Sequence, residues 1–127
     1  MREEVNLWWK QALKDLEAAE INLKNKIYYI AAFLSQQAVE KALKALFIKK
    51  LKKSPGTTHS LVYLGKEVNI PSNLIENLRK LTPDFVISRY PDITQTLPYE
   101  LYDEETAKEK IKLAKEVLKW IEKQLKS

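Results

Sequence analysis

Residues 31 to 45 read AAFLSQQAVEKALKA, and this stretch decides the fold. Alanine or serine recurs through it at helical spacing, so the helix that it forms presents small side chains against which another helix can approach closely. We expect this helix to run from Ile27 to about Lys53, where the sequence SPG at residues 54–56 ends it. Because so much of its surface is small or apolar, we place it at the centre of a helical bundle.

Long amphipathic helices are predicted near both ends of the chain. The first spans Glu4 to Asn25 and carries apolar residues at steps of three and four: Val5, Trp9, Ala12, Leu16, Ala19 and Leu23. The last follows Asp103, whose carboxylate can cap it. Its apolar stripe consists of Ala107, Ile111, Ala114, Leu118, Ile121 and Leu125.

Shorter helices are expected in the middle of the chain. A hydroxyl at Thr58 or Ser60 can cap a helix that ends near Val68, and Ser72 can cap a further helix that ends before Pro83. No stretch alternates polar and apolar residues for long enough to form a strand. The sequence therefore predicts an all-α protein, one domain over residues 1–127, built as an antiparallel up-and-down bundle of four to five helices.

The composition excludes several kinds of site. The 127 residues include no cysteine and two glycines, which removes thiol catalysis, zinc knuckles, iron–sulfur clusters and Gly-rich phosphate loops, and we expect no cofactor. The formal net charge is +5, with three arginines among 22 basic residues, so anionic partners are favoured but not required. Abundant lysine and glutamate with little glycine is also typical of thermophile proteins. With no long apolar run, we expect a cytoplasmic protein that does not enter a membrane.

The polar residues of the central helix share one of its sides: Gln37, Glu40, Lys41 and Lys44. Solvated helix faces commonly look like this. If the helix is central, however, these groups need partners inside a cleft, because buried polar groups are costly when unpaired. The residues Arg89 and Asp92 are the candidates for that role.

The single histidine, His59, lies at the head of a short predicted helix. One interpretation is a half-buried imidazole that caps or packs the loop. The alternative is a functional group, because histidine is the side chain most easily poised near neutral pH. One histidine cannot build a His-ligated metal centre, so we expect no metal site.

Arg89 lies in the segment from Asp84 to Tyr102, which fits no regular element, and long irregular segments are often functional. One interpretation is a surface ion pair with Asp92 or Glu100, of little energetic value. The alternative is that the planar guanidinium of Arg89 contacts a phosphate while the ring of Tyr90 stacks on a base.

Four blocks of sequence carry a family resemblance. They are Trp9 with Asp15-Leu16, the block from Ala31 to Ala45, Thr58-His59-Ser60-Leu61, and Ser88-Arg89-Tyr90-Pro91-Asp92. Together they resemble the HEPN family, whose name stands for higher eukaryotes and prokaryotes nucleotide-binding. The resemblance implies a homodimeric helical bundle that binds a nucleotide or nucleic-acid phosphate. It also implies a small nucleotidyltransferase as partner, in a toxin–antitoxin-like pair.

The resemblance assigns nucleotide binding to Arg89, Tyr90 and Asp92 and to the polar side of the central helix. Many family members are metal-independent ribonucleases in which four to six residues separate an arginine from the histidine that follows it. Residues 94 to 96 of this chain are Thr, Gln and Thr, and none of these is a general acid or base. Two alternatives therefore stay open: a ribonuclease in which His59 reaches Arg89 in space, or a non-catalytic module for dimerisation.

Overall fold

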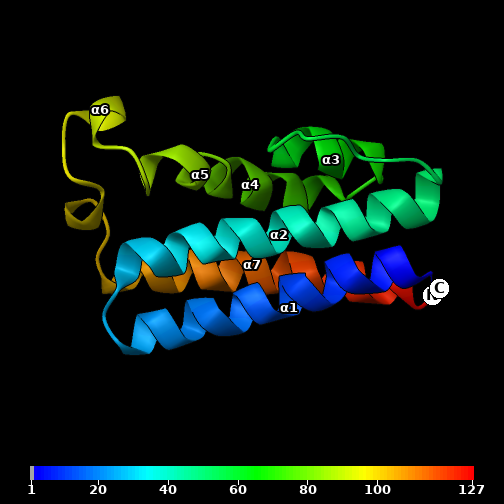
Figure 1. Ribbon diagram of the computed structural model, residues 1–127, viewed down its shortest axis with the longest axis horizontal. Coiled ribbons are helices and arrows are strands. Elements are labelled where there is room, and N and C mark those ends of the chain that lie inside the picture. The colour runs from blue at the N-terminus through cyan, green and yellow to red at the C-terminus, as the bar shows by residue number, and fades with distance from the viewer. Residues whose placement is uncertain (1) are drawn as a thin grey trace.

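Three long helices form the body of the protein in the computed structural model, which describes residues 2–127 except for the side chain of Thr94. Helices α1 (Glu3–Lys24) and α2 (Tyr28–Leu51) are antiparallel neighbours, and α7 (Glu104–Leu125) packs against both (Figure 1). Helices α3 (Leu61–Glu67) and α4 (Ser72–Leu81) lie on the other side of α2 from α1 and carry the chain back along the bundle. This return makes α2 and α7 run in the same direction.

The prediction of an all-α fold is confirmed, since residues 2–127 contain helices and no strand. The five helices named above agree with the expected four to five. Residues 84–102, which fitted no regular element, form three further short turns: α5 (Asp84–Ile87), α6 (Pro91–Thr94) and the 3₁₀ turn η1 (Pro98–Glu100). Within the described part of the chain, every helix is too short or too polar to cross a membrane.

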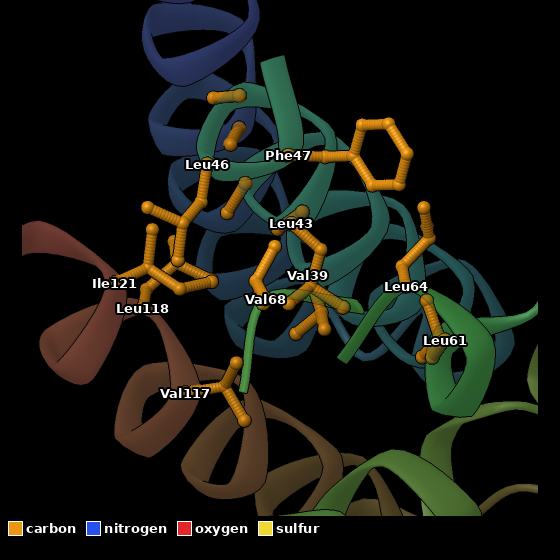
Figure 2. Close-up of a cluster of buried hydrophobic side chains, with 14 of the residues drawn as sticks. Val39, Leu43, Leu46, Phe47, Leu61, Leu64, Val68, Val117, Leu118 and Ile121 are labelled. Atoms are coloured by element: carbon orange, nitrogen blue, oxygen red, sulfur yellow. The ribbon is translucent and has the colours of Figure 1, made fainter. Parts of the chain in front are cut away.

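Helix α2 is central, as its small side chains predict, and it contacts α1, α3, α4, α5, η1 and α7. Its fully buried alanines are Ala31, Ala32, Ala38, Ala42 and Ala45. Larger side chains of α2 meet α3 and α7 in the main core, which Figure 2 shows at Val39, Leu43, Leu46, Phe47, Leu61, Leu64, Val117, Leu118 and Ile121. Each buried side chain of this size contributes about 1.5 to 3 kcal/mol. The core therefore fixes α2 and the side chains that point from it.

Two expected helix boundaries are confirmed, at the end of α1 and at the start of α3. The chain reverses between α1 and α2 at Lys26, whose φ of 64° is left-handed and ends a helix. Of the two candidate caps for α3, Ser60 serves, because its Oγ accepts a hydrogen bond from the Tyr63 N–H at 3.2 Å. The Thr58 hydroxyl instead accepts from the Ser60 N–H at 3.1 Å and shapes the loop that carries His59.

The prediction for the start of α4 is wrong and the prediction for α7 is confirmed. Ser72 is the first helical residue of α4 rather than its cap, and the cap position is Pro71, with no side-chain hydrogen bond. The fixed φ of proline already sets the chain for helix entry there. At α7, the Asp103 carboxylate accepts from the Thr106 N–H at 2.8 Å.

Candidate functional site

His59 is held by a buried carboxylate of α2. Its Nδ1 lies 3.0 Å and 3.2 Å from the two oxygens of Glu40, a residue only 4% exposed. An ionised carboxylate only accepts, so we assign the ring proton to Nδ1 of His59. This leaves Nε2 as the nitrogen that can accept or release a proton at the surface, where half of the side chain is exposed.

Glu40 is saturated by donors from its own helix as well. Lys44 Nζ and Gln36 Nε2 each lie 3.1 Å from one of its oxygens. Lys44 is itself buried, and its ammonium group lies 5.5 Å from the ring centre of Trp8 in α1. Glu40 and Lys44 therefore form a buried hydrogen-bonded pair. Glu40 in turn holds the imidazole of His59 at Nδ1.

Lys41 and Gln37 lie nearer the surface of the same side of α2. Lys41 Nζ contacts the Asp15 carboxylate of α1 at 2.5 Å, and Gln11 donates to the other oxygen of Asp15 at 2.9 Å. Gln37 is half-buried and donates to the side chain of Gln36 at 2.8 Å.

These contacts correct the prediction that Arg89 and Asp92 are the partners of the polar side of α2. The partners are Asp15, Gln36 and His59, because α1 and the loop before α3 pack directly over the polar row of α2. Asp15 was not identified from the sequence as the partner of Lys41. The feature that could have indicated it is a carboxylate next to Leu16, within the apolar stripe of the first helix.

Arg89 lies against aromatic rings rather than against carboxylates. Its Cζ is 4.2 Å from the ring centre of Phe85, 5.0 Å from that of Phe33 and 4.9 Å from that of Tyr90. Its Nε donates to the Phe85 carbonyl at 2.7 Å, which fixes the guanidinium plane. Such cation–π contacts contribute about 0.5 to 1 kcal/mol at exposed positions. Among the described residues no ion pair joins Arg89 to Asp92, which lies in α6 beside a separate hollow.

One aromatic ring brings Arg89 and His59 together. The ring centre of Phe85 is 4.0 Å from that of His59, with an angle of 21° between the planes. Phe85 therefore contacts both the imidazole of His59 and the guanidinium of Arg89. Neither Phe33 nor Phe85 was identified from the sequence, because a single phenylalanine at a helical position usually belongs to a core.

A surface pocket of about 390 Å³ opens beside Arg89. Its lining is mostly aromatic or aliphatic, with one cation: Tyr29, Ile30, Phe33, Ser88, Arg89, Pro98 and Tyr99. Pockets that bind planar ligands commonly combine apolar walls with a small number of placed polar groups. The guanidinium of Arg89 supplies such a group here.

The profile of the HEPN domain family matches residues 5–124. The chain belongs to the HEPN family. A Methanocaldococcus jannaschii protein named "Putative toxin MJ1304" is 33% identical over an alignment that covers 94% of this chain and 87% of the relative.

Solved structures of HEPN and related proteins share the fold. TT1696 from Thermus thermophilus has a TM-score of 0.88 at 29% identity, with coverage of 97% of this chain and 99% of that one. ST0689, described as an archaeal HEPN homologue, has a TM-score of 0.83 at 35% identity, covering 97% and 98%. An HEPN domain protein from Thermotoga maritima has a TM-score of 0.73 at 25% identity, covering 94% and 97%.

Residues 94 to 96, where the family resemblance would place a histidine, lie at the end of α6 and just after it. Gln95 has a left-handed φ of 60° there, and its side chain donates to the Asp92 carbonyl at 3.0 Å. The side chain of Thr94 lies outside the described residues. The imidazole that shares a contact with Arg89 is His59, which stacks on Phe85 from the loop after α2.

Proposed function

We propose that this HEPN protein binds the phosphate of a nucleotide or nucleic acid at Arg89. The observation that supports the proposal is the fixed orientation of the guanidinium. Phe85 holds it by ring and carbonyl, and no hydrogen bond or ion pair engages its terminal nitrogens among the described side chains, so a ligand in the adjoining pocket is proposed to bind them. A planar guanidinium binds phosphate through two parallel hydrogen bonds. The rings of Tyr29 and Tyr99 offer faces on which a base can stack.

Lys41 and Gln37 are proposed to extend this site along α2, since both are partly exposed on its polar side. Tyr90 and Asp92 are proposed to contact the ligand from the segment after Arg89. Glu40 and Lys44 are proposed to act indirectly, by fixing the position of His59.

The proposed biological role is that of the toxin in a two-protein system. Its support is the similarity to a relative that carries the name of a toxin. The protein is further proposed to be a single domain and to act in the cytoplasm. A small nucleotidyltransferase is the proposed partner, which follows from the family resemblance of the sequence. Co-purification with the product of the neighbouring gene tests this part, and a neighbour that forms no complex contradicts it.

Titration with ATP and with a short fluorescein-labelled single-stranded RNA tests the phosphate site. Arg89→Ala should weaken binding by about 10 to 100-fold, the value of a charge-assisted hydrogen-bonded pair. Arg79→Ala is the matched control, because Arg79 is exposed in α4 and pairs with Glu76. Binding should weaken between about 50 and about 200 mM salt. A wild-type protein that binds neither ligand at low salt, or binds equally well without Arg89, contradicts the proposal.

A metal-independent ribonuclease that uses His59 and Arg89 is the second candidate function. The observation in its favour is the Glu40 carboxylate, which orients Nδ1 of His59 and can stabilise the imidazolium. His59 would take the proton of a ribose 2′-hydroxyl while the 2′ oxygen bonds to the adjacent phosphorus. The bond from phosphorus to the 5′ oxygen would break, the 5′ oxygen would take a proton from water, and His59 would release its proton to the solvent. Arg89 would steady the phosphate charge, and the product would be a 2′,3′-cyclic phosphate.

Cleavage of labelled RNA in the presence of EDTA tests this candidate. His59→Ala should abolish cleavage, and Glu40→Gln should reduce it by weakening the hold on the imidazole. Thr57→Ala is a control in the same loop. Cleavage that survives His59→Ala assigns the activity to another group or to contamination.

A homodimer is a further part of the proposal. Large apolar side chains are exposed on the segment after Arg89: Tyr90, Ile93, Leu97, Tyr99 and Leu101. Exposed apolar patches commonly mark interaction surfaces. Light scattering that gives a monomer at micromolar concentration contradicts this part.

Heat adaptation is also proposed, and a thermal midpoint inside the mesophile range of about 45 to 65 °C contradicts it.

A further inference from the structure

A buried carboxylate that the proposed ligand site does not use lies at the start of α5. Asp84 is only 3% exposed. The Tyr102 hydroxyl donates to its Oδ1 at 2.5 Å, and Lys110 Nζ lies 2.9 Å from its Oδ2. Lys110 also donates to the carbonyl of Lys80 at 2.7 Å. The trio of Asp84, Tyr102 and Lys110 therefore joins the end of α4, the start of α5, the residue before the α7 cap and α7 itself.

The polar trio supplies the fully buried contacts of α5, beside the partly buried contacts that the turn makes with α2. The helix has four residues, and an isolated turn of that length is not stable. Phe85, Val86 and Ile87 are only partly buried. The buried side chains of the turn are Asp84 and, just after it, Ser88, whose hydroxyl donates to the Asp84 carbonyl.

Arg89 depends on α5 through two contacts with Phe85. The ring of Phe85 lies under the guanidinium, and its carbonyl accepts from Nε. Phe85 directly follows Asp84 in the chain. A shift of the Asp84 backbone therefore moves both supports of the arginine together, and it also moves the ring on which His59 stacks.

We propose that Asp84, Tyr102 and Lys110 are positioning residues for Arg89. The trio fixes α5 so that the guanidinium faces the pocket beside Tyr29 and Tyr99. It also joins the two ends of the segment 85–101, because Asp84 precedes that segment and Tyr102 follows it. The ligand part of this inference rests on the proposed function.

The energetics of the trio agree with a positioning role. Burial raises the pKa of Asp84, while the hydrogen bond from Tyr102 and the contact with the charged Lys110 act in the opposite direction. Buried ion pairs contribute little net stability, because desolvation offsets their attraction, whereas their directional bonds allow few alternative arrangements. The buried charges of the trio are therefore better explained by a need to hold α5 in one position than by a contribution to the stability of the fold.

Amide hydrogen exchange without ligand tests the structural half of the proposal. The N–H groups of Arg89 and Tyr90 both donate to the Val86 carbonyl, so they report on this turn. They should exchange at least about 10-fold faster in Tyr102→Phe, while the amides of α2 keep their protection. Tyr63→Phe is the matched control, since Tyr63 is largely exposed on α3. Unchanged exchange at Arg89 and Tyr90 overturns the proposal.

Affinity for the labelled RNA tests the functional half. Tyr102→Phe should weaken binding about 10-fold, in the direction of Arg89→Ala, whereas Tyr63→Phe should bind as the wild type does. Asp84→Asn keeps an acceptor for Tyr102 and should bind better than Asp84→Ala. Normal affinity in Tyr102→Phe together with fast exchange overturns the positioning role. If the wild type binds no RNA or ATP, the proposed function fails, and the exchange data alone decide whether the trio holds Arg89.

Discussion

Replacing Glu40 with leucine should destabilise the protein by about 3 to 5 kcal/mol, because it leaves a buried lysine without its partner. The side chains of Glu40 and Lys44 are 5% and 6% exposed, and their charged atoms are 3.1 Å apart. After the substitution, the ammonium of Lys44 would keep only the ring of Trp8, 5.5 Å away. The total stability of a domain is about 5 to 15 kcal/mol, so the single variant should lie close to unfolding.

The double variant Glu40→Leu with Lys44→Met should recover part of this loss. It removes both charges and fills the space with apolar atoms, and such replacements of buried pairs are commonly neutral. His59 then loses its acceptor, but half of its side chain is exposed and water can take that place. The fully buried Gln36 also loses its acceptor, which should retain about 1 to 3 kcal/mol of the loss. Glu17→Leu is the control, because Glu17 and Lys14 form an exposed pair at 3.3 Å, and the change should be below about 0.5 kcal/mol.

The free energies of unfolding of the wild type, the single variants Glu40→Leu and Lys44→Met, and the double variant are measured by urea unfolding, with far-UV circular dichroism as the signal. These four values form a double-mutant cycle, which gives the coupling energy between Glu40 and Lys44. A loss below about 1 kcal/mol in Glu40→Leu would show that water reaches Lys44 and that the pair is not desolvated. A double variant as unstable as the sum of the single variants would refute the coupling.

Three further predictions concern the core, a cap and pH. Phe47→Ala should cost about 3 to 5 kcal/mol in urea unfolding, because the ring is 1% exposed, and a smaller loss would contradict its place in the core. Ser60→Ala should cost about 1 kcal/mol through the lost α3 cap, more than Thr58→Ala costs. Burial raises the pKa of Asp84 above 3.8, so the folded protein holds this proton more tightly than the unfolded chain. Wild type should therefore lose stability relative to Asp84→Asn as the pH rises from 3.8 to the raised pKa, by at most about 1.4 kcal/mol per unit, and a pH-independent difference would contradict the burial effect.

The long helices and the central place of α2 are predictable from the sequence, because both follow from local periodicity. The buried alanines of α2 and the apolar stripe of α7 recur at helical spacing, and Asp103 and Ser60 are caps with a local partner. The predicted start of α4 is wrong by one residue. A serine is a common cap, but here Pro71 with its fixed φ holds the cap position and Ser72 is already helical.

Residues 84–102 were not predictable in the same way. Their three turns are too short to show a period, and the bonds that hold them reach distant parts of the chain. Tyr102 reaches Asp84 across 18 residues, and Lys110 reaches Lys80 across 30. No local pattern in a sequence reports such a contact.

The sequence by itself determined which side chains could act: one imidazole, an arginine in an irregular segment, and a polar row on the central helix. Only the tertiary structure decided how they combine. It turned Glu40 and Lys44 inward, paired Lys41 with Asp15, and placed Phe85 in contact with both His59 and Arg89. The physical reason is that helical periodicity sets the face of a side chain, whereas its partner depends on which distant helix packs over that face.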